Sequence, residues 1–401
     1  MKTISFIRTI KTVILVSAIL LISAPGYSDD QFSFRFAVLS DAHLDTYAKD
    51  DPAYFKLLNQ SADILRIAID ELNTLNKDDN AENDIDFVLF SGDNSNGRKM
   101  EEYILLKEIL DGLEIPFYMV DGDWDYSPDY SPRIVNKYYG VPYLNLDEHV
   151  MYDDSALVGV RKYDYSVDFA NSDGDIIHII GMDNVLHFDG NRGSFEPEQI
   201  EWLASDLDSN RGKPVVIFEH CPVLSPYLET ATNTASDARW VPFTKRSEEE
   251  NLYGPNAFTL DLPSKKDRAA DRSEDFLDLI EQYKVPLVIT GDYHINKKTP
   301  YPNDYPVSLI TISPALVSYP CAYTIYDYSD NQITWETKRI EKYAEMSEQY
   351  YQASLETYNK IYTTLSADQF LFNIEKSRSL SWGSDDGESN DWFGCFPLIN
   401  R

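Results

Sequence analysis

The chain of 401 residues has few cysteines and few basic residues, and each shortage argues against a class of protein. Its three cysteines, Cys221, Cys321 and Cys395, are too few for a disulfide scaffold, although one pair could form in any of three pairings. Lys and Arg number 35 against 67 Asp and Glu, which gives a formal net charge of −32 at pH 7. A surface this acidic repels phosphate polymers and anionic lipid head groups, so charge predicts no nucleic-acid partner.

Long apolar runs are also missing. Beyond residue 28 there is no stretch of about 18 apolar residues, the length that a membrane-spanning helix needs. Residues 1–28 have basic Lys2, Arg8 and Lys11, a short apolar segment at 12–23, and small or turn-forming residues after it. This order is typical of a secretory signal peptide. We therefore expect an exported protein, periplasmic or extracellular, without a stable membrane anchor.

Short apolar stretches alternate with helical patterns instead. Residues 54–75 carry apolar side chains at helical spacing, and buried, β-branched stretches lie on either side of them. Successive strand–helix units of this kind predict a layered α/β sheet. The predicted strands are residues 36–39, 85–90, 115–120, 163–169, 175–181, 214–220, 285–290, 308–312, 322–328 and 332–336, and the predicted helices are 54–75, 100–113, one starting near 195, and 338–364.

Acidic residues or histidines follow five of the buried strands. The loops beyond the carboxyl ends of strands are where an open α/β sheet binds its ligands, and carboxylate oxygen beside imidazole suits a divalent metal ion. Any one of these residues could equally be a solvated turn residue, so it is the ordered set that indicates a metal site. The set is Asp41, His43, Asp93, Asp123, His220, Asp292 and His294.

The order of these motifs resembles the calcineurin-like metallophosphoesterase superfamily, particularly its secreted phosphodiesterase and acid phosphatase branch. The resemblance covers about residues 34–335, including the helix near 195 and the stretch Ser313-Pro314-Ala315-Leu316. It implies a four-layer αββα sandwich of two mixed β-sheets flanked by helices. We place the phosphoesterase domain at 32–338, with an insertion at about 222–272 and a C-terminal helix and tail at 339–401.

The resemblance also implies a two-metal centre that hydrolyses a phosphomonoester or phosphodiester, with a metal-bound hydroxide as the nucleophile. The cofactors would be two divalent ions (Mn, Fe, Zn or Mg), and the partner a small-molecule phosphoester substrate. Asp41, His43 and His294 would bind one ion, Asp123, His220 and Asp292 the other, and Asp93 would bridge them.

Two motifs depart from the family pattern. The third loop, normally Gly-Asn-His-Asp/Glu, is Gly122-Asp123-Trp124-Asp125, and the last, normally Gly-His-x-His, has Asp292 in place of its first histidine. Four carboxylates would then neutralise two divalent ions, where the family keeps a formal charge of about +2. A more highly charged metal or a protonated Asp would compensate. The oxygen-rich second site should favour Mn or Mg over Zn.

Trp124 stands where the family has the histidine thought to protonate the leaving group. Indole cannot act as an acid, although its N–H donates one hydrogen bond. No catalytic acid is therefore assigned. His187, in a polar loop, is a candidate replacement and substrate contact, or simply a surface residue. Trp124 could instead stack on a flat or sugar-bearing substrate, and the 222–272 insertion could be a lid or a surface excursion.

Two functional hypotheses remain open from sequence. The first is a phosphoester hydrolase with weak or absent acid assistance. The second is a non-catalytic protein that binds metal or ligand on the same fold, favoured by Trp124 and the neutralised centre. The substrate, the metal and the oligomeric state are not readable from these residues.

Overall fold

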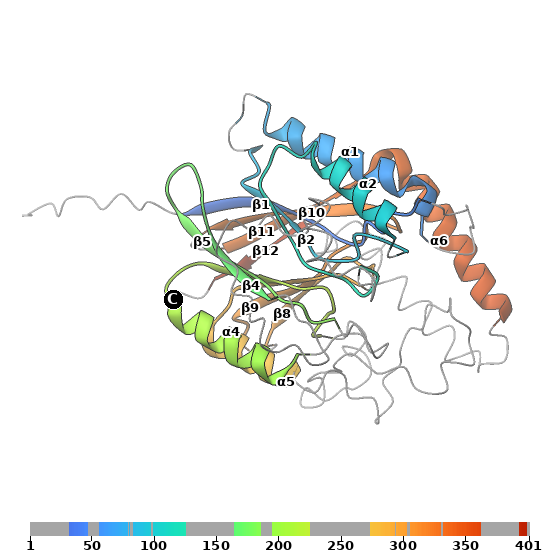
Figure 1. Ribbon diagram of the computed structural model, residues 1–401. Helices are drawn as coiled ribbons and strands as arrows, with labels where there is room; N and C mark the ends of the chain where they lie inside the picture. The colour runs from blue at the N-terminus through green and yellow to red at the C-terminus, as the bar shows by residue number, and fades with distance from the viewer. Residues whose placement is uncertain are drawn as a thin grey trace, which may run out of the picture.

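The structure is a computed structural model that describes residues 32–46, 56–78, 80, 83–97, 99–125, 164–185, 195–224, 273–292, 294–302, 305–329, 332–361 and 393–398. The predicted signal peptide, His187 and most of the 222–272 insertion lie outside these ranges. Two six-stranded mixed sheets pack face to face, with α1, α2 and α6 outside the first and α4 and α5 outside the second (Figure 1). The α/β sandwich predicted from the sequence is confirmed.

The first sheet is centred on β1, which is hydrogen-bonded to β2 in parallel and to β10 in antiparallel orientation. Its strand order is β12-β11-β10-β1-β2-β3. Because β1, β2 and β3 run parallel, their carboxyl ends reach the same edge of the sheet. The strands are β1 (Ser33–Leu39), β2 (Phe87–Phe90), β3 (Phe117–Met119), β10 (Ala322–Ser329), β11 (Gln332–Arg339) and β12 (Phe393–Pro397).

The second sheet has the order β4-β5-β6-β7-β9-β8, with a parallel centre and one antiparallel strand at each edge. Its central strands are buried on both faces, which explains their unbroken apolar sequences. The strands are β4 (Tyr165–Ala170), β5 (Ile176–Gly181), β6 (Val215–Phe218), β7 (Leu287–Thr290), β8 (Lys297–Tyr301) and β9 (Ser308–Ile312).

The helices begin and end where local sequence favours it. Helix α4 starts with Pro197 in its first turn, and the side chains of Glu196 and Gln199 form a capping box there. The predicted 54–75 helix is shorter in the structure, since a 3₁₀ turn, η1 (Leu58–Gln60), precedes α1. The helices are α1 (Ser61–Leu75), α2 (Met100–Leu110), α4 (Pro197–Ser209), α5 (Ser273–Tyr283) and α6 (Glu341–Ile361).

Aromatic residues fill much of the core. Phe36 of β1 stacks on Phe87 of β2 with ring centroids 4.8 Å apart, inside an apolar cluster that includes residues of both sheets and α1. A second cluster lies between the second sheet and its helices, where Phe195 stacks on Phe276 at 4.7 Å. Burial on this scale fixes both sheets, and therefore the loops at their ends.

Two edge strands were not predicted. Strand β8 is rich in polar residues and contains Pro300, a composition that strands tolerate only at an edge. Strand β12 lies in the C-terminal tail, where we predicted no strand, and it pairs with β11. Gly394 permits this pairing, since a Cβ there would collide with the indole of Trp335.

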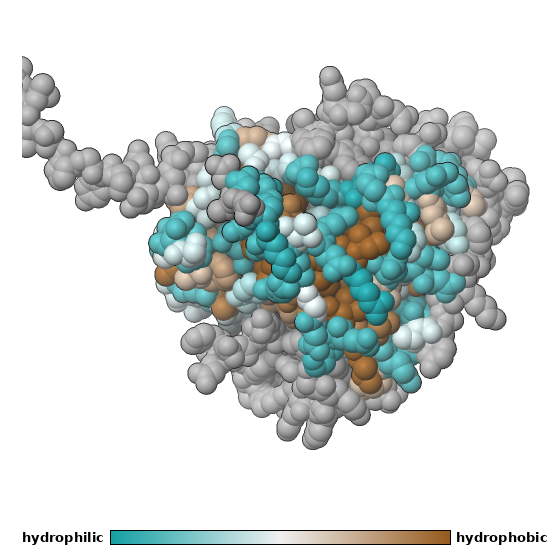
Figure 2. All heavy atoms as spheres, turned by 90° about the horizontal axis from the view of Figure 1, so that it is seen from above, coloured by the Kyte–Doolittle hydropathy of each residue, from teal (hydrophilic) through white to brown (hydrophobic). Residues whose placement is uncertain are grey.

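The surface over α1, α2 and α6 is mostly polar. Seen from the side of α1, α2 and α6, the described surface is largely hydrophilic, with hydrophobic atoms gathered in a strip (Figure 2). Among the helices whose residues are described, none is long and apolar enough to cross a membrane.

All three cysteines are free, with Cys221 and Cys321 buried and Cys395 exposed, so none of the three possible disulfides is present.

Candidate metal centre

The backbone is strained at most of the predicted ligand positions. Five of the seven residues have positive φ, a conformation that residues other than glycine rarely adopt. Each such residue costs about 1–3 kcal/mol, and strain of this kind clusters at functional sites. The five are Asp41 (φ 52°), His43 (39°), Asp93 (53°), Asp292 (64°) and His294 (56°).

Backbone hydrogen bonds hold the loops of the two sheets together. Asp41 N–H donates to the carbonyl of Gly92 at 3.0 Å, which joins the loops after β1 and β2. Gly291 N–H donates to the carbonyl of His220 at 2.8 Å and joins the loops after β6 and β7. The ring of His220 then crosses between sheets, with Nδ1 2.8 Å from the carbonyl oxygen of Ser91. The predicted ligands therefore converge at one place.

The first group of potential ligands is Asp41, His43, Asp93 and His294, all of them buried. The Nε2 atoms of the two histidines are 3.1 Å apart, and Nε2 of His294 lies 3.1 Å from Oδ1 of Asp41. Nε2 of His43 is 3.3 Å from Oδ2 of Asp93. These spacings suit ligands that surround one ion, since metal–nitrogen and metal–oxygen bonds are about 2.0–2.2 Å long.

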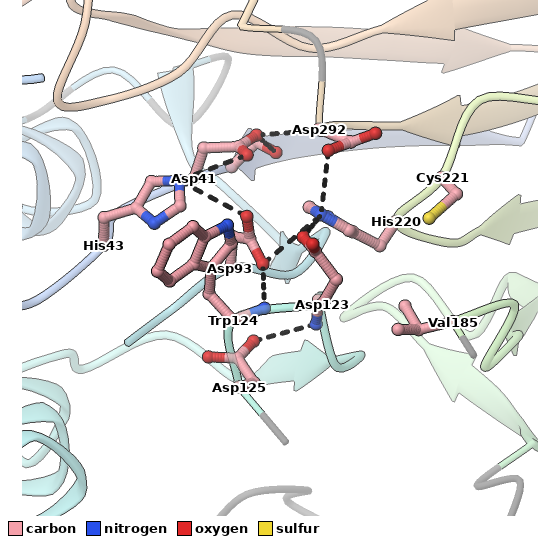
Figure 3. A network of polar contacts seen from close by, with 12 residues as sticks. Asp41, His43, Asp93, Asp123, Trp124, Asp125, Val185, His220, Cys221 and Asp292 are labelled. Carbon is pink, nitrogen blue, oxygen red and sulfur yellow. Dashed lines mark hydrogen bonds and ion pairs between the residues drawn. The ribbon is translucent and has the colours of Figure 1, made fainter. Parts of the chain in front are cut away.

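The second group is Asp93, Asp123, His220 and Asp292. Nε2 of His220 points between three carboxylates, 3.4 Å from Asp93, 3.7 Å from Asp123 and 3.9 Å from Asp292 (Figure 3). Within each group one ligand atom per residue lies within 4.8 Å of the others, and Asp93 belongs to both. The structure thus brings all seven residues together in the grouping that the family resemblance implies, with Asp93 in both sets.

Two of the histidines are oriented through their second nitrogen. Nδ1 of His220 faces the carbonyl of Ser91, which can only accept, so Nδ1 carries a proton and Nε2 is the nitrogen left to bind an ion. Nδ1 of His294 lies 2.6 Å from the hydroxyl of Ser318. Partners of this kind fix the ring and the tautomer of metal-binding histidines. Neither Ser91 nor Ser318 carried a sequence signal for this role.

Glycines make room for the close approach of the loops. A Cβ on Gly92, whose φ is 94°, would lie 2.5 Å from Nδ1 of His220. A Cβ on Gly122 would collide with the backbone and carboxylate of Asp93. Side chains at these positions would displace a ligand, which explains the Gly-Asp pairs that the sequence places here.

The electrostatics of the centre favour a bound cation. Burial, and then the charge of Asp123, raise the pKa of Asp93 to about 8 although His220 lowers it. Burial lowers the pKa of His220, but Asp93 and Asp123 outweigh it and hold that pKa well above its usual value. A bound divalent ion favours ionised carboxylates and neutral imidazoles.

One buried atom of the centre shows the same need. Nε2 of His220 makes no hydrogen bond within the described part of the chain, although three carboxylates lie 3.4 to 3.9 Å from it. A buried polar atom of this kind normally has a partner, and a metal ion is one. The donor set of carboxylate oxygens and imidazole nitrogens therefore fits two divalent ions, with the second group richer in oxygen.

Asp125 organises the third loop. Its carboxylate accepts hydrogen bonds from the backbone N–H groups of Asn94, Ser95 and Gly122 at 3.0, 2.7 and 2.9 Å. Its own carbonyl accepts from the hydroxyl of Tyr103. The loops after β2 and β3 are thereby tied together, and the backbone N–H of Trp124 donates to Asp93 at 2.9 Å.

Trp124 lies beside the first group. Its ring meets that of His43 edge-on, with centroids 6.2 Å apart, and is half-buried (Figure 3). Lys56, which sequence reasoning missed, is buried next to both: its Nζ is 2.9 Å from Nε2 of His43 and 5.0 Å from the centre of the indole ring. Burial and this ammonium charge hold the pKa of His43 well below its usual value.

A model of the calcineurin-like phosphoesterase family matches residues 34–296. The chain belongs to this family. The resemblance inferred from the strand-end motifs is confirmed.

The probable glycerophosphodiester phosphodiesterase GpdQ of Arcobacter nitrofigilis is 24% identical over 144 residues, 36% of this chain and 44% of that relative. The alignment thus spans less than half of the relative's length. Among solved structures, purple acid phosphatase PPD1 of yellow lupin gives a TM-score of 0.44 at 13% identity, covering 77% of this chain and 52% of that one. YfkN of Bacillus subtilis gives 0.41 at 9% identity, covering 87% and 99%.

Proposed function

We propose that this protein hydrolyses a small phosphomonoester or phosphodiester at a dinuclear metal centre. The observation that carries the proposal is the pair of ligand groups sharing Asp93 at the junction of the two sheets. Two divalent ions held there would polarise a phosphoryl oxygen, lower the pKa of water and stabilise the leaving oxygen.

The protein's own residues would hold and orient that chemistry. Asp41, His43 and His294 would bind the first ion, Asp123, His220 and Asp292 the second, and Asp93 both. Ser91 and Ser318 keep the rings of His220 and His294 aimed inward. Trp124 can donate a hydrogen bond to substrate but supplies no proton, so esters with leaving groups of low pKa should react fastest.

A second candidate function is metal or ligand binding without turnover. It is favoured by the side chain of Trp124, which lies against His43 where a protonating group would be useful, and by the four carboxylates of the centre. The two functions differ in one outcome only, since both predict that the protein holds metal.

The deciding experiment uses protein stripped of metal and reloaded with Mn, Zn, Fe or Mg. We expect hydrolysis of an activated aryl phosphomonoester or of the matching diester, and the relative above suggests adding a glycerophosphodiester. Asp93→Asn should abolish both metal retention and turnover, while Asp208→Asn, an exposed carboxylate on α4, should change neither. Loaded protein that retains two ions but turns over none of these esters would refute the hydrolase and support the binding protein.

The predicted export rests on residues 1–28 alone and stays a prediction, as does any role of His187. Periplasmic or culture-medium recovery of the full chain would test the first.

A further inference from the structure

We infer that Lys56 is a substrate-binding residue of this centre, where its ammonium group binds a non-bridging oxygen of the phosphoryl group. The inference rests on the proposed function and deepens it. The positive charge of Lys56 compensates for the four negative charges that the ligand set brings to the centre.

The need for this positive charge follows from counting charges. Asp41, Asp93, Asp123 and Asp292 contribute four negative charges, which two divalent ions only neutralise. A phosphate monoester carries up to two negative charges, and a neutral centre attracts it weakly. Nζ of Lys56 lies 2.9 Å from Nε2 of His43, the nitrogen assigned to the first ion. An ion bound there would take up this lone pair and leave the ammonium to donate to another acceptor, and the charge of Lys56 makes the centre cationic.

The position of Lys56 points to the substrate side. Among the described residues of the centre, Asp123 and Trp124 are partly exposed while the remaining ligands are buried. The ammonium of Lys56 lies 5.0 Å from the centre of the Trp124 ring and 2.9 Å from Nε2 of His43. An anion that binds beside Trp124 would therefore be within reach of both Lys56 and the first ligand group.

The surroundings hold Lys56 in this place. The next residue, Leu57, is fully buried, and its N–H donates to the carbonyl of Val317 at 2.6 Å. The same segment carries Ser318, whose hydroxyl orients His294. The lysine and a predicted metal ligand therefore share one support, and the contact of an ammonium with an aromatic face restricts its long side chain further. A preorganised cation of this kind loses little conformational entropy when it binds its ligand.

The experiment measures orthophosphate binding, by calorimetry at saturating Mn, together with Mn content per chain. Lys56→Met should keep two Mn ions per chain and bind orthophosphate about 10- to 100-fold more weakly, the usual worth of a hydrogen bond to a charged group. Lys56→Arg should recover most of the affinity. With an aryl phosphomonoester, Lys56→Met should raise KM more than it lowers kcat, and Asp208→Asn should leave all these quantities unchanged.

Three outcomes would overturn the inference. Unchanged orthophosphate affinity in Lys56→Met would leave the hydrolase standing and remove the role of the lysine. Tighter Mn binding without weaker phosphate binding would show that the ammonium takes the place of an ion. Loss of Mn in both Lys56→Met and Lys56→Gln would assign the lysine to the fold. Failure of the unsubstituted protein to load Mn would instead refute the proposed function.

Discussion

Two histidines of this protein lie among carboxylates, and their surroundings differ. His178, on the outer side of the second sheet, has Nδ1 2.7 Å from Asp168 and Nε2 2.7 Å from Asp206, so both nitrogens are hydrogen-bonded. His220 has Nδ1 on a backbone carbonyl, while Nε2 faces three carboxylates at 3.4 to 3.9 Å and makes no hydrogen bond to any residue that the structure describes. The first is a completed ion-pair network, and the second has the open geometry of a metal ligand.

The comparison shows that residue type alone does not distinguish a structural ion pair from a metal site. Carboxylates at hydrogen-bond distance from both ring nitrogens favour an imidazolium, whose positive charge completes the network. Carboxylates grouped around one ring nitrogen, 3.4 to 3.9 Å from it, leave room for a cation between them.

Matched substitutions should separate the two histidines most strongly. His220→Leu should lose one Mn ion per chain and lower turnover by about 10³-fold, the upper range for losing one preorganised electrostatic group. His178→Leu should retain both ions and most of the turnover. Metal content by mass spectrometry and kcat on an aryl phosphomonoester test this, and equal metal loss in both variants would contradict the distinction.

A smaller change in rate is expected from a substitution of Trp124, which lies beside His43 and provides no proton. Trp124→His should speed esters with leaving groups of high pKa by about 10²-fold, the lower range for general acid catalysis. Esters of acidic phenols should change little, because their leaving groups need no proton. Rates across a series of leaving groups measure this, and an equal change for all esters would show that the acid step is not what is missing.

The smallest effect concerns the ion pairs of His178 with Asp168 and Asp206, whose contribution to stability depends on pH. Burial lowers the pKa of His178, but hydrogen bonds and charges from Asp206 and Asp168 outweigh it and raise that pKa. The stability that His178 contributes is therefore complete below its unfolded pKa of about 6.5 and is lost as the pH rises through the folded pKa. We expect His178→Leu to cost about 1–2 kcal/mol near pH 6 and less near pH 9. Urea denaturation at both pH values tests this, and a cost that grows with pH would reverse the assignment.

The fold and the seven clustered residues were predictable for physical reasons. Parallel strands buried on both faces need unbroken apolar sequences, and each one of them delivers its next residues to the same edge of the sheet. The residues that support the centre were harder to find. Lys56 precedes a helix and has no motif, and Ser91 acts through its backbone carbonyl, which any residue could supply. Strand β8 looked polar because only one of its edges is paired.

The register of β1 has a consequence for the newly made chain. Ser33 of β1 pairs with Ser329 of β10. Almost 300 further residues must therefore be synthesised after Ser33 before β1 has its second neighbouring strand. Both ligand groups are likewise incomplete until residues 292 and 294 have been added. At a synthesis rate of roughly 5–20 residues per second, the chain spends many seconds with β1 lacking its second neighbour. Both ligand groups can therefore be completed only after residue 294 has been added, and chains stalled before residue 292 should be protease-sensitive whether or not metal is present.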